Sequence, residues 1–131
     1  NKRLILNFGH TFAHSIEMAT ERLTKKEYYR HGEAVGLGIL CEIYFSNMGE
    51  NKLLKNVEGL LKLYGLPIKI DKGDFHNKKH ILLNNIYKFI FLDKKKISRY
   101  PRYISMKKLN KPTVKELQNN HLILETINNF I

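Results

Sequence analysis

An apolar stripe at helical spacing opens the chain between residues 4 and 22. Apolar residues that recur every three or four positions lie on one side of an α-helix, and such a side is normally buried. The spacing therefore predicts a helix over 4–22 whose apolar side faces a core. The stripe consists of Leu4, Phe8, Phe12, Ile16 and Ala19.

The next two segments differ sharply in polarity. Residues 24–33 are polar and break the helical period, which indicates a connection. Residues 33–47 are apolar on nearly every side, which is typical of a helix buried within a domain. Gly36 and Gly38 lie inside this second helix, although each glycine lowers helix propensity by up to about 1 kcal/mol. We therefore expect another backbone or a ligand to approach this helix closely, with loose packing as the alternative.

Two further helices are predicted in the second half of the chain. Residues 51–65 carry apolar positions at helical spacing and end on Gly65, with Pro67 shortly after, which is typical of a helix C-terminus. A polar loop that begins at Ile68 then leads into a fourth helix over about 78–92.

The last part of the chain combines an extended segment with a helix. Residues 100–106, "YPRYISM", favour a short extended segment because of the proline, the tyrosines and Ile104. Thr113 and Glu116 have the spacing of a capping box, which predicts a terminal helix after them. The fold class is therefore mainly α, a compact helical domain with one short extended segment that spans residues 1–131 as a single domain.

Composition changes this picture little. The apolar share of 43% in 131 residues is that of one globular domain, and the longest apolar run, residues 34–45, contains Glu42 and is too short for a bilayer. Cys41 cannot form an internal disulfide because it is the one cysteine. No secretory signal opens the sequence, so we expect a cytoplasmic protein without a membrane segment. The abrupt start without an initiator Met indicates a piece of something longer.

The net charge of +11 raises the question of nucleic-acid binding, because clustered Lys and Arg neutralise phosphates. The lysines are instead scattered, with one short run at 93–96, and no aromatic-basic motif accompanies them. A solvated basic surface is the better interpretation, with no specific nucleic-acid partner. An anionic small molecule suits such a chain.

The polar side of the first predicted helix carries the candidate chemistry. At about 100° per residue, five polar side chains fall within one arc opposite the apolar stripe. Two imidazoles at positions i and i+4 can converge on one metal ion, although the Glu of the H-E-x-x-H protease motif is missing here. His76 and His80 have the same spacing in "HNKKH" at 76–80. These two residues and His121 are interpreted as exposed surface histidines without a function. The five side chains are Arg3, Asn7, His10, His14 and Glu17.

His31 stands immediately ahead of the buried second helix. Gly32 leaves the backbone room there, and Glu33 stabilises the helix N-terminus electrostatically. From the residues alone His31 is equally a plain helix start or a functional side chain, and both interpretations stay open.

The segments "RLILNFGHTFAHSIE" and "HGEAVGLGI" resemble the 3-dehydroquinate synthase family, whose pattern is approximately R-x-L-L-N-x-G-H-T-x-G-H-A-x-E followed by H-G-E-x-V-A-x-G. "YGLP" at 64–67 and "FLDKK" at 91–95 follow in the family's order, so the resemblance covers nearly the whole chain. It implies the C-terminal helical half of a two-domain enzyme, with the N-terminal nucleotide-binding domain absent from these residues.

The resemblance also implies an activity. The family converts 3-deoxy-D-arabino-heptulosonate 7-phosphate into 3-dehydroquinate in the shikimate pathway of aromatic amino acid biosynthesis, with loss of phosphate. It is a carbon-oxygen lyase that uses NAD and a divalent metal, zinc in most cases and cobalt as the alternative. NAD is held mainly by the absent domain, so no residue here is assigned to that cofactor. The fragment alone is expected to be inactive, and the complete enzyme to be a homodimer.

The resemblance also implies roles for individual residues of this chain. His10 and His31 match the two histidine ligands of the metal, whose third ligand is a glutamate in the absent domain. His14 matches a histidine that handles protons near the substrate phosphate. The anionic substrate is held by residues that match Arg3, Asn7, His14 and Arg102, while Glu17 and Glu33 are interpreted as supports of an imidazole or of a helix end.

Two departures and several alternatives accompany this resemblance. Ala13 replaces a common Gly, and "KKLNKP" at 107–112 replaces an apolar-Ile-Gly ending after the strand that carries Arg102. Another sugar-phosphate cyclase, such as a 2-deoxy-scyllo-inosose synthase, is the nearest alternative, and an iron- or zinc-type polyol dehydrogenase is more distant. An alternative from a non-enzyme class is a non-catalytic remnant that acts as a helical interaction module.

Overall fold

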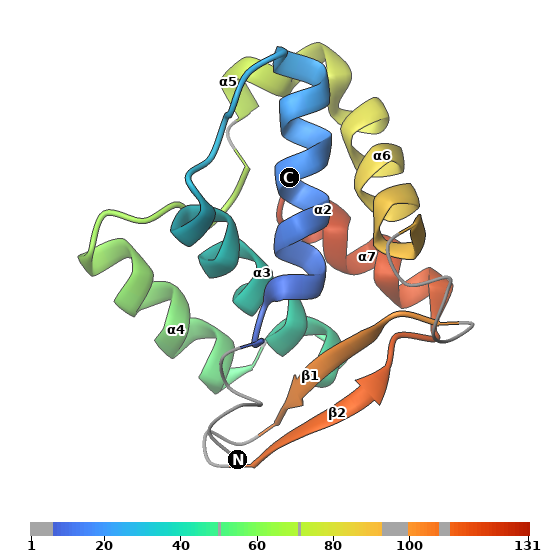
Figure 1. Cartoon of the computed structure of the whole chain (residues 1–131). Helices are drawn as coiled ribbons and strands as arrows, with labels where there is room; N and C mark the ends of the chain where they lie inside the picture. Colours follow the sequence, from blue (N-terminus) through green and yellow to red (C-terminus); the bar gives the residue numbers. More distant parts are fainter. Residues whose placement is uncertain (1–6, 50, 71, 93–99, 108–110) are drawn as a thin grey trace.

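The computed structural model describes residues 7–49, 51–70, 72–92, 100–107 and 111–131. Within them the chain forms a helical body with a small antiparallel sheet at one end (Figure 1). The elements in chain order are α2 (His10–Thr24), α3 (His31–Ser46), α4 (Lys52–Leu63), α5 (Lys72–Phe75), the 3-10 helix η1 (His76–Lys78), α6 (Lys79–Leu92), β1 (Arg102–Met106), β2 (Pro112–Glu116) and α7 (Asn120–Asn129). The mainly helical fold class is confirmed.

The core forms around α3, which contacts α2, α4, α7 and β1. Because neighbours surround it, this helix is apolar on all sides, as its sequence predicts. Helix α2 lies between α3 and α6 and buries the predicted stripe at Phe12, Ile16 and Ala19. No helix in the part of the chain that the structure describes is long and apolar enough to cross a membrane.

The first helix begins later than its apolar spacing predicts. Residues 7–9 form a turn, and Gly9 takes the left-handed backbone conformation with φ of 83°, so α2 begins at His10. Leu4 and Arg3 lie outside the described residues. The prediction was wrong over 7–9 because apolar spacing does not report a left-handed residue, which interrupts helical hydrogen bonding.

The middle helices lie close to their predicted ranges. Helix α3 takes in His31, and the Glu33 carboxylate accepts a hydrogen bond from the Arg30 backbone N–H at 2.8 Å, which caps its N-terminus as expected. Helix α4 is capped by the side chain of Asn51 and is followed by Gly65 with φ of 71°. The prediction of a polar loop before α6 was only partly right, since this segment contains the short helices α5 and η1.

The capping box predicted at Thr113 and Glu116 is wrong. Both residues lie in β2, which pairs antiparallel with β1 and places Ser105 opposite Thr113. Helix α7 begins after Asn119, whose side chain accepts a hydrogen bond from the Leu122 backbone N–H. Pairing with the preceding strand β1 decided the conformation of 112–116, because the spacing within a segment does not report a partner strand outside it.

Candidate functional site

The site is built where the N-terminus of α2 crosses α3. A Cβ atom on Gly38 would lie 2.0 Å from the carbonyl oxygen of Gly9, so the two backbones touch. A Cβ on Gly36 would instead meet only the Leu61 side chain at 3.5 Å. The expected close approach is therefore confirmed at Gly38, and Gly36 is not part of it. This contact fixes the position of His10, the first residue of α2.

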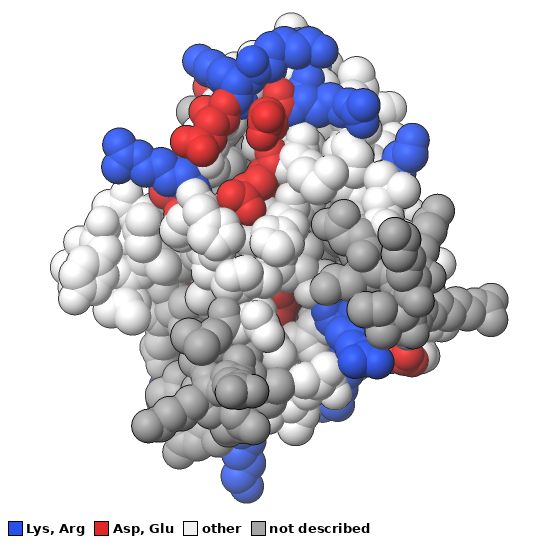
Figure 2. Space-filling model, viewed as in Figure 1, with Lys and Arg blue, Asp and Glu red and all other residues white. Residues whose placement is uncertain are grey.

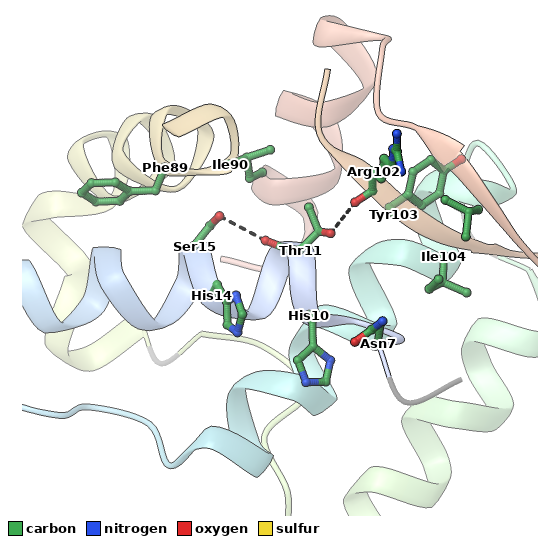
Figure 3. A pocket seen from close by; sticks show the side chains of 11 residues that line it. Asn7, His10, Thr11, His14, Ser15, Phe89, Ile90, Arg102, Tyr103 and Ile104 are labelled. Carbon is green, nitrogen blue, oxygen red and sulfur yellow. Dashed lines mark hydrogen bonds between the residues drawn. The ribbon is translucent and has the colours of Figure 1, made fainter. Parts of the chain in front are cut away.

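Three imidazoles meet beside this crossing. The ring centroids of His10 and His31 lie 5.4 Å apart, those of His10 and His14 5.6 Å apart, and those of His14 and His31 6.1 Å apart. His10 and His14 project from the same side of α2 on successive turns (Figure 3). His31 is the first residue of α3 and reaches the same place from the neighbouring helix.

A carboxylate supports the third imidazole. The Nδ1 atom of His31 lies 3.3 Å and 3.2 Å from the two carboxylate oxygens of Glu17. Glu17 is one helical turn beyond His14 on α2, so its side chain belongs to the same polar face. A carboxylate on one ring nitrogen orients an imidazole and leaves its other nitrogen, Nε2, for a ligand.

The spacing of His10 and His31 fits a shared metal ion. Two imidazoles bound to one tetrahedral zinc at about 2.1 Å place their ring centroids roughly 5 Å apart, close to the 5.4 Å observed. Within the described ranges, no three His, Cys, Asp or Glu side chains form a group able to hold an ion. The spacing of His10 and His31 therefore suits two positions of a coordination sphere.

A cavity of about 350 Å³ opens beside the histidines. Its polar wall comes mainly from α2 and the turn before it, with Arg102 contributed by β1, and its apolar wall comes from α6 and the sheet (Figure 3). Such a mixture suits a small polar molecule. The lining residues are Asn7, His10, Thr11, His14, Ser15, Phe89, Ile90, Arg102, Tyr103, Ile104 and Val114.

Helix side chains hold β1 against this cavity. One edge of β1 pairs with β2, and polar side chains of α2 and α3 meet the other edge. Thr11 donates a hydrogen bond from its hydroxyl to the Arg102 carbonyl (Figure 3). Farther along, Glu42 accepts from the Ile104 N–H at 2.8 Å, and Ser46 accepts from the Met106 N–H at 3.0 Å. The long connection from α6 to β1 thus ends at a fixed place beside α2.

Most of the predicted site residues come together. Asn7, His10 and His14 line the cavity, and the His31 ring packs against the two histidines. Arg102 also lines the cavity, although in Figure 3 its guanidinium extends from β1 on the other side of α2 from the imidazoles. Arg3 lies outside the described residues. The histidines interpreted as decoration, His76, His80 and His121, are exposed.

Sequence reasoning missed three polar contributors. Thr11 and Ser15 line the cavity between the histidine turns, and Ser15 donates a hydrogen bond to the Thr11 carbonyl. Glu42 is completely buried behind them. One signal was present for Glu42, because it is the one acidic residue in the apolar run of 34–45.

Basic side chains do not form one stripe on the face shown in Figure 2. One group of Lys and Arg side chains lies over the end of α2 nearest α5, at the top of the view, with acidic residues beside it. Other basic side chains lie at separate places. This distribution agrees with the scattered lysines of the sequence and with a solvated basic surface.

Comparison with known proteins adds an independent line of evidence. The family described as 3-dehydroquinate synthase C-terminal matches residues 1–96. The chain is 40% identical over 134 residues to a 3-dehydroquinate synthase of Pelagibacter ubique, covering 98% of this chain and 33% of the relative. Against the 3-dehydroquinate synthase of Clostridium tetani it is 36% identical over 132 residues, covering 98% and 32%. The chain spans about a third of the length of these relatives.

Proposed function

The chain belongs to the 3-dehydroquinate synthase family, and from that membership we propose that it is the metal- and substrate-binding part of an enzyme that forms 3-dehydroquinate. The substrate is 3-deoxy-D-arabino-heptulosonate 7-phosphate, and phosphate is released. The observation that carries this proposal is the meeting of the His10, His14 and His31 rings, of which His10 and His14 line the cavity. A chance pair of histidines on α2 does not explain why the His31 ring, which comes from α3, lies beside both of them.

His10 and His31 would hold a divalent ion, zinc by preference. Their ring spacing supports this role, and the Glu17 carboxylate on His31 is the arrangement common behind zinc-binding histidines. When bound, the ion supplies Lewis-acid polarisation of a substrate hydroxyl. We propose that the third metal ligand and the NAD site lie in the rest of the complete protein, because the family places both in its N-terminal domain.

His14 is the proposed proton-transfer residue. Its ring is exposed on the cavity wall, one turn from His10 and next to Ser15. Imidazole is the side chain most often used for general acid–base catalysis, and a position beside the substrate is the geometric requirement for it. His14 would move a proton at a ring nitrogen while its neighbours hold the metal.

The substrate's negative charge would be met by groups from two directions. Asn7 offers an amide beside His10, and Arg102 offers a guanidinium from β1. Arg forms strong bidentate hydrogen bonds with carboxylate and phosphate. Arg3, four residues before Asn7, is proposed to join them on the basis of the family pattern.

Substitutions in the complete protein test these roles. We expect His10→Ala and His31→Ala to lose bound zinc, because each removes one of the two ligands supplied here. His14→Ala should retain zinc and lower kcat by about 10² to 10⁴-fold, the usual contribution of a general acid or base. Zinc content by elemental analysis and phosphate release from the heptulosonate substrate are the two measurements.

His80→Ala is the matched control, because His80 is an exposed histidine on α6 away from the cavity. It should keep both zinc and activity. Normal zinc content in both ligand variants would contradict the metal assignment. Absence of turnover in the complete wild-type protein with NAD and zinc, or turnover of another sugar phosphate instead, would contradict the proposed reaction.

A further inference from the structure

We propose that Glu42 is a positioning residue that sets the distance between the N-terminus of α2, which carries His10, and β1, which carries Arg102. The inference rests on the proposed function, because it assigns Glu42 a part in shaping that same site. Glu42 does not line the cavity, so it acts through the segments it holds.

The burial and the hydrogen bonding of Glu42 support this role. Its side chain is completely buried in the middle of α3. One carboxyl oxygen accepts the Ile104 N–H at 2.8 Å, while the other oxygen has no hydrogen-bond partner among the described residues. Burial raises the pKa of Glu42 to about 8, and the backbone N–H groups of Ile104, Gly9 and Thr11 act in the opposite direction. The carboxyl group therefore binds β1 through the Ile104 N–H, and it lies one helical turn from Gly38, where α3 touches the backbone that leads into α2.

The identity of those donors is the second evidence. Gly9 and Thr11 flank His10, and Ile104 lies two residues after Arg102 on β1. Helix α2 has no side-chain cap of its own at Gly9, so its first N–H groups need acceptors from elsewhere. Glu42 binds β1 at Ile104 from the same face of α3 as Gly38, which touches Gly9 before α2, whereas Ser46 holds the distal end of β1 at Met106.

If position 42 served only the packing of the core, an apolar side chain would be more favourable there than a carboxyl group. Burying a carboxyl group with an unbonded oxygen is unfavourable, and core positions are normally apolar. Residues that weaken local stability occur mainly where function needs a fixed geometry. Glu42 is therefore placed to hold the cavity's two walls in register rather than to stabilise the core.

Three variants of the complete protein test the inference. Glu42→Met keeps the length of an unbranched side chain and removes both acceptor oxygens, so it should lower kcat/KM by about 10²-fold, as a misplacement near 1 Å does. Its zinc affinity should fall about 10-fold, the lower end of the effect seen for residues behind a metal ligand. Glu42→Gln retains an acceptor for the Ile104 N–H and should restore both values nearly to wild type.

Ser46→Ala is the matched control, since it removes the neighbouring clamp on β1 without touching α2. It should leave kcat/KM and zinc affinity close to wild type, even if its melting temperature falls. The inference is overturned if Glu42→Met has wild-type kcat/KM and zinc affinity, or if the losses in Glu42→Met and Ser46→Ala simply follow their melting temperatures. Should Glu42→Met fail to fold, Glu42→Asp, with its carboxyl drawn back by one methylene, replaces it with the same expected losses and the same overturning result.

The two proposals fail in different ways. A complete wild-type protein that releases no phosphate contradicts the proposed function. Zinc affinities of the same variants still decide the role of Glu42 in that case, because they require no turnover.

Discussion

At the scale of single residues, the site is a set of imidazoles whose orientation is set by their neighbours. His31 is more than half exposed, at 57%, so packing alone does not fix its ring. Glu17, with 27% of its side chain exposed, supplies the orienting contact from α2. An exposed imidazole held by a partly buried carboxylate keeps one orientation, which suits the metal-binding role proposed for His31.

Replacement of Glu17 by Ala should weaken zinc binding in the complete protein. We expect a loss of about 10- to 100-fold in zinc affinity, because the His31 ring would no longer be held in one orientation. Competition with a chelator measures this affinity directly. Glu21→Ala, one turn later on the exposed side of α2, is the control and should bind zinc as the wild type does. Equal affinities for the two variants would contradict an orienting role for Glu17.

At the scale of elements, close contact between α2 and α3 is what brings the histidines together. Gly9 and Gly38 allow the two backbones to touch, and the helices then run so that Glu17 reaches His31 at the other end of the contact. The sequence pointed to Gly38 through its low helix propensity but pointed equally to Gly36. Only the crossing point of the helices distinguishes these two glycines, and a crossing point is a tertiary property.

Alanine substitutions at the two glycines should have opposite effects on stability. Gly38→Ala places a methyl group 2.0 Å from the Gly9 carbonyl oxygen, so we expect the free energy of unfolding to fall by about 3 kcal/mol or more, and zinc binding to weaken as the helices separate. Gly36→Ala meets only ordinary contact with Leu61 and should raise the free energy of unfolding by up to about 1 kcal/mol through helix propensity. Urea unfolding of both variants measures the difference. A mild effect at Gly38 would show that the helices adjust freely.

At the scale of the whole molecule, the cavity belongs to no continuous part of the chain. Its walls come from the turn before α2, from α2 itself, from α6 and from the two strands, which are separated by up to about a hundred residues in sequence. The described domain supplies two proposed metal ligands and spans about a third of its relatives' length.

The stability of the whole fold should depend on pH through Glu42. Its pKa rises from 4.5 to about 8 on burial, so between these values the folded protein keeps a proton that the unfolded chain has released. The free energy of unfolding therefore falls as pH rises across this range, by about 1.4 kcal/mol per pH unit. Glu42→Gln cannot titrate, and relative to wild type it should gain about 2 to 3 kcal/mol between pH 5.5 and 7.5. Urea unfolding at both pH values checks this, and a constant difference would contradict it.

The amino-acid sequence by itself determined the helices and the family. Apolar spacing is a local property of the chain, so α3, α4 and α6 were predicted close to their observed bounds, and the motif around His10 and His14 carried the resemblance that comparison confirmed. Local spacing could not report Gly9's left-handed backbone, the pairing of β2 with β1, or the meeting of His31 with His10 and Glu17. Tertiary structure decided these three, because each depends on a backbone or side chain outside the local segment: α3 against Gly9, β1 against 112–116, and Glu17 with His10 against His31.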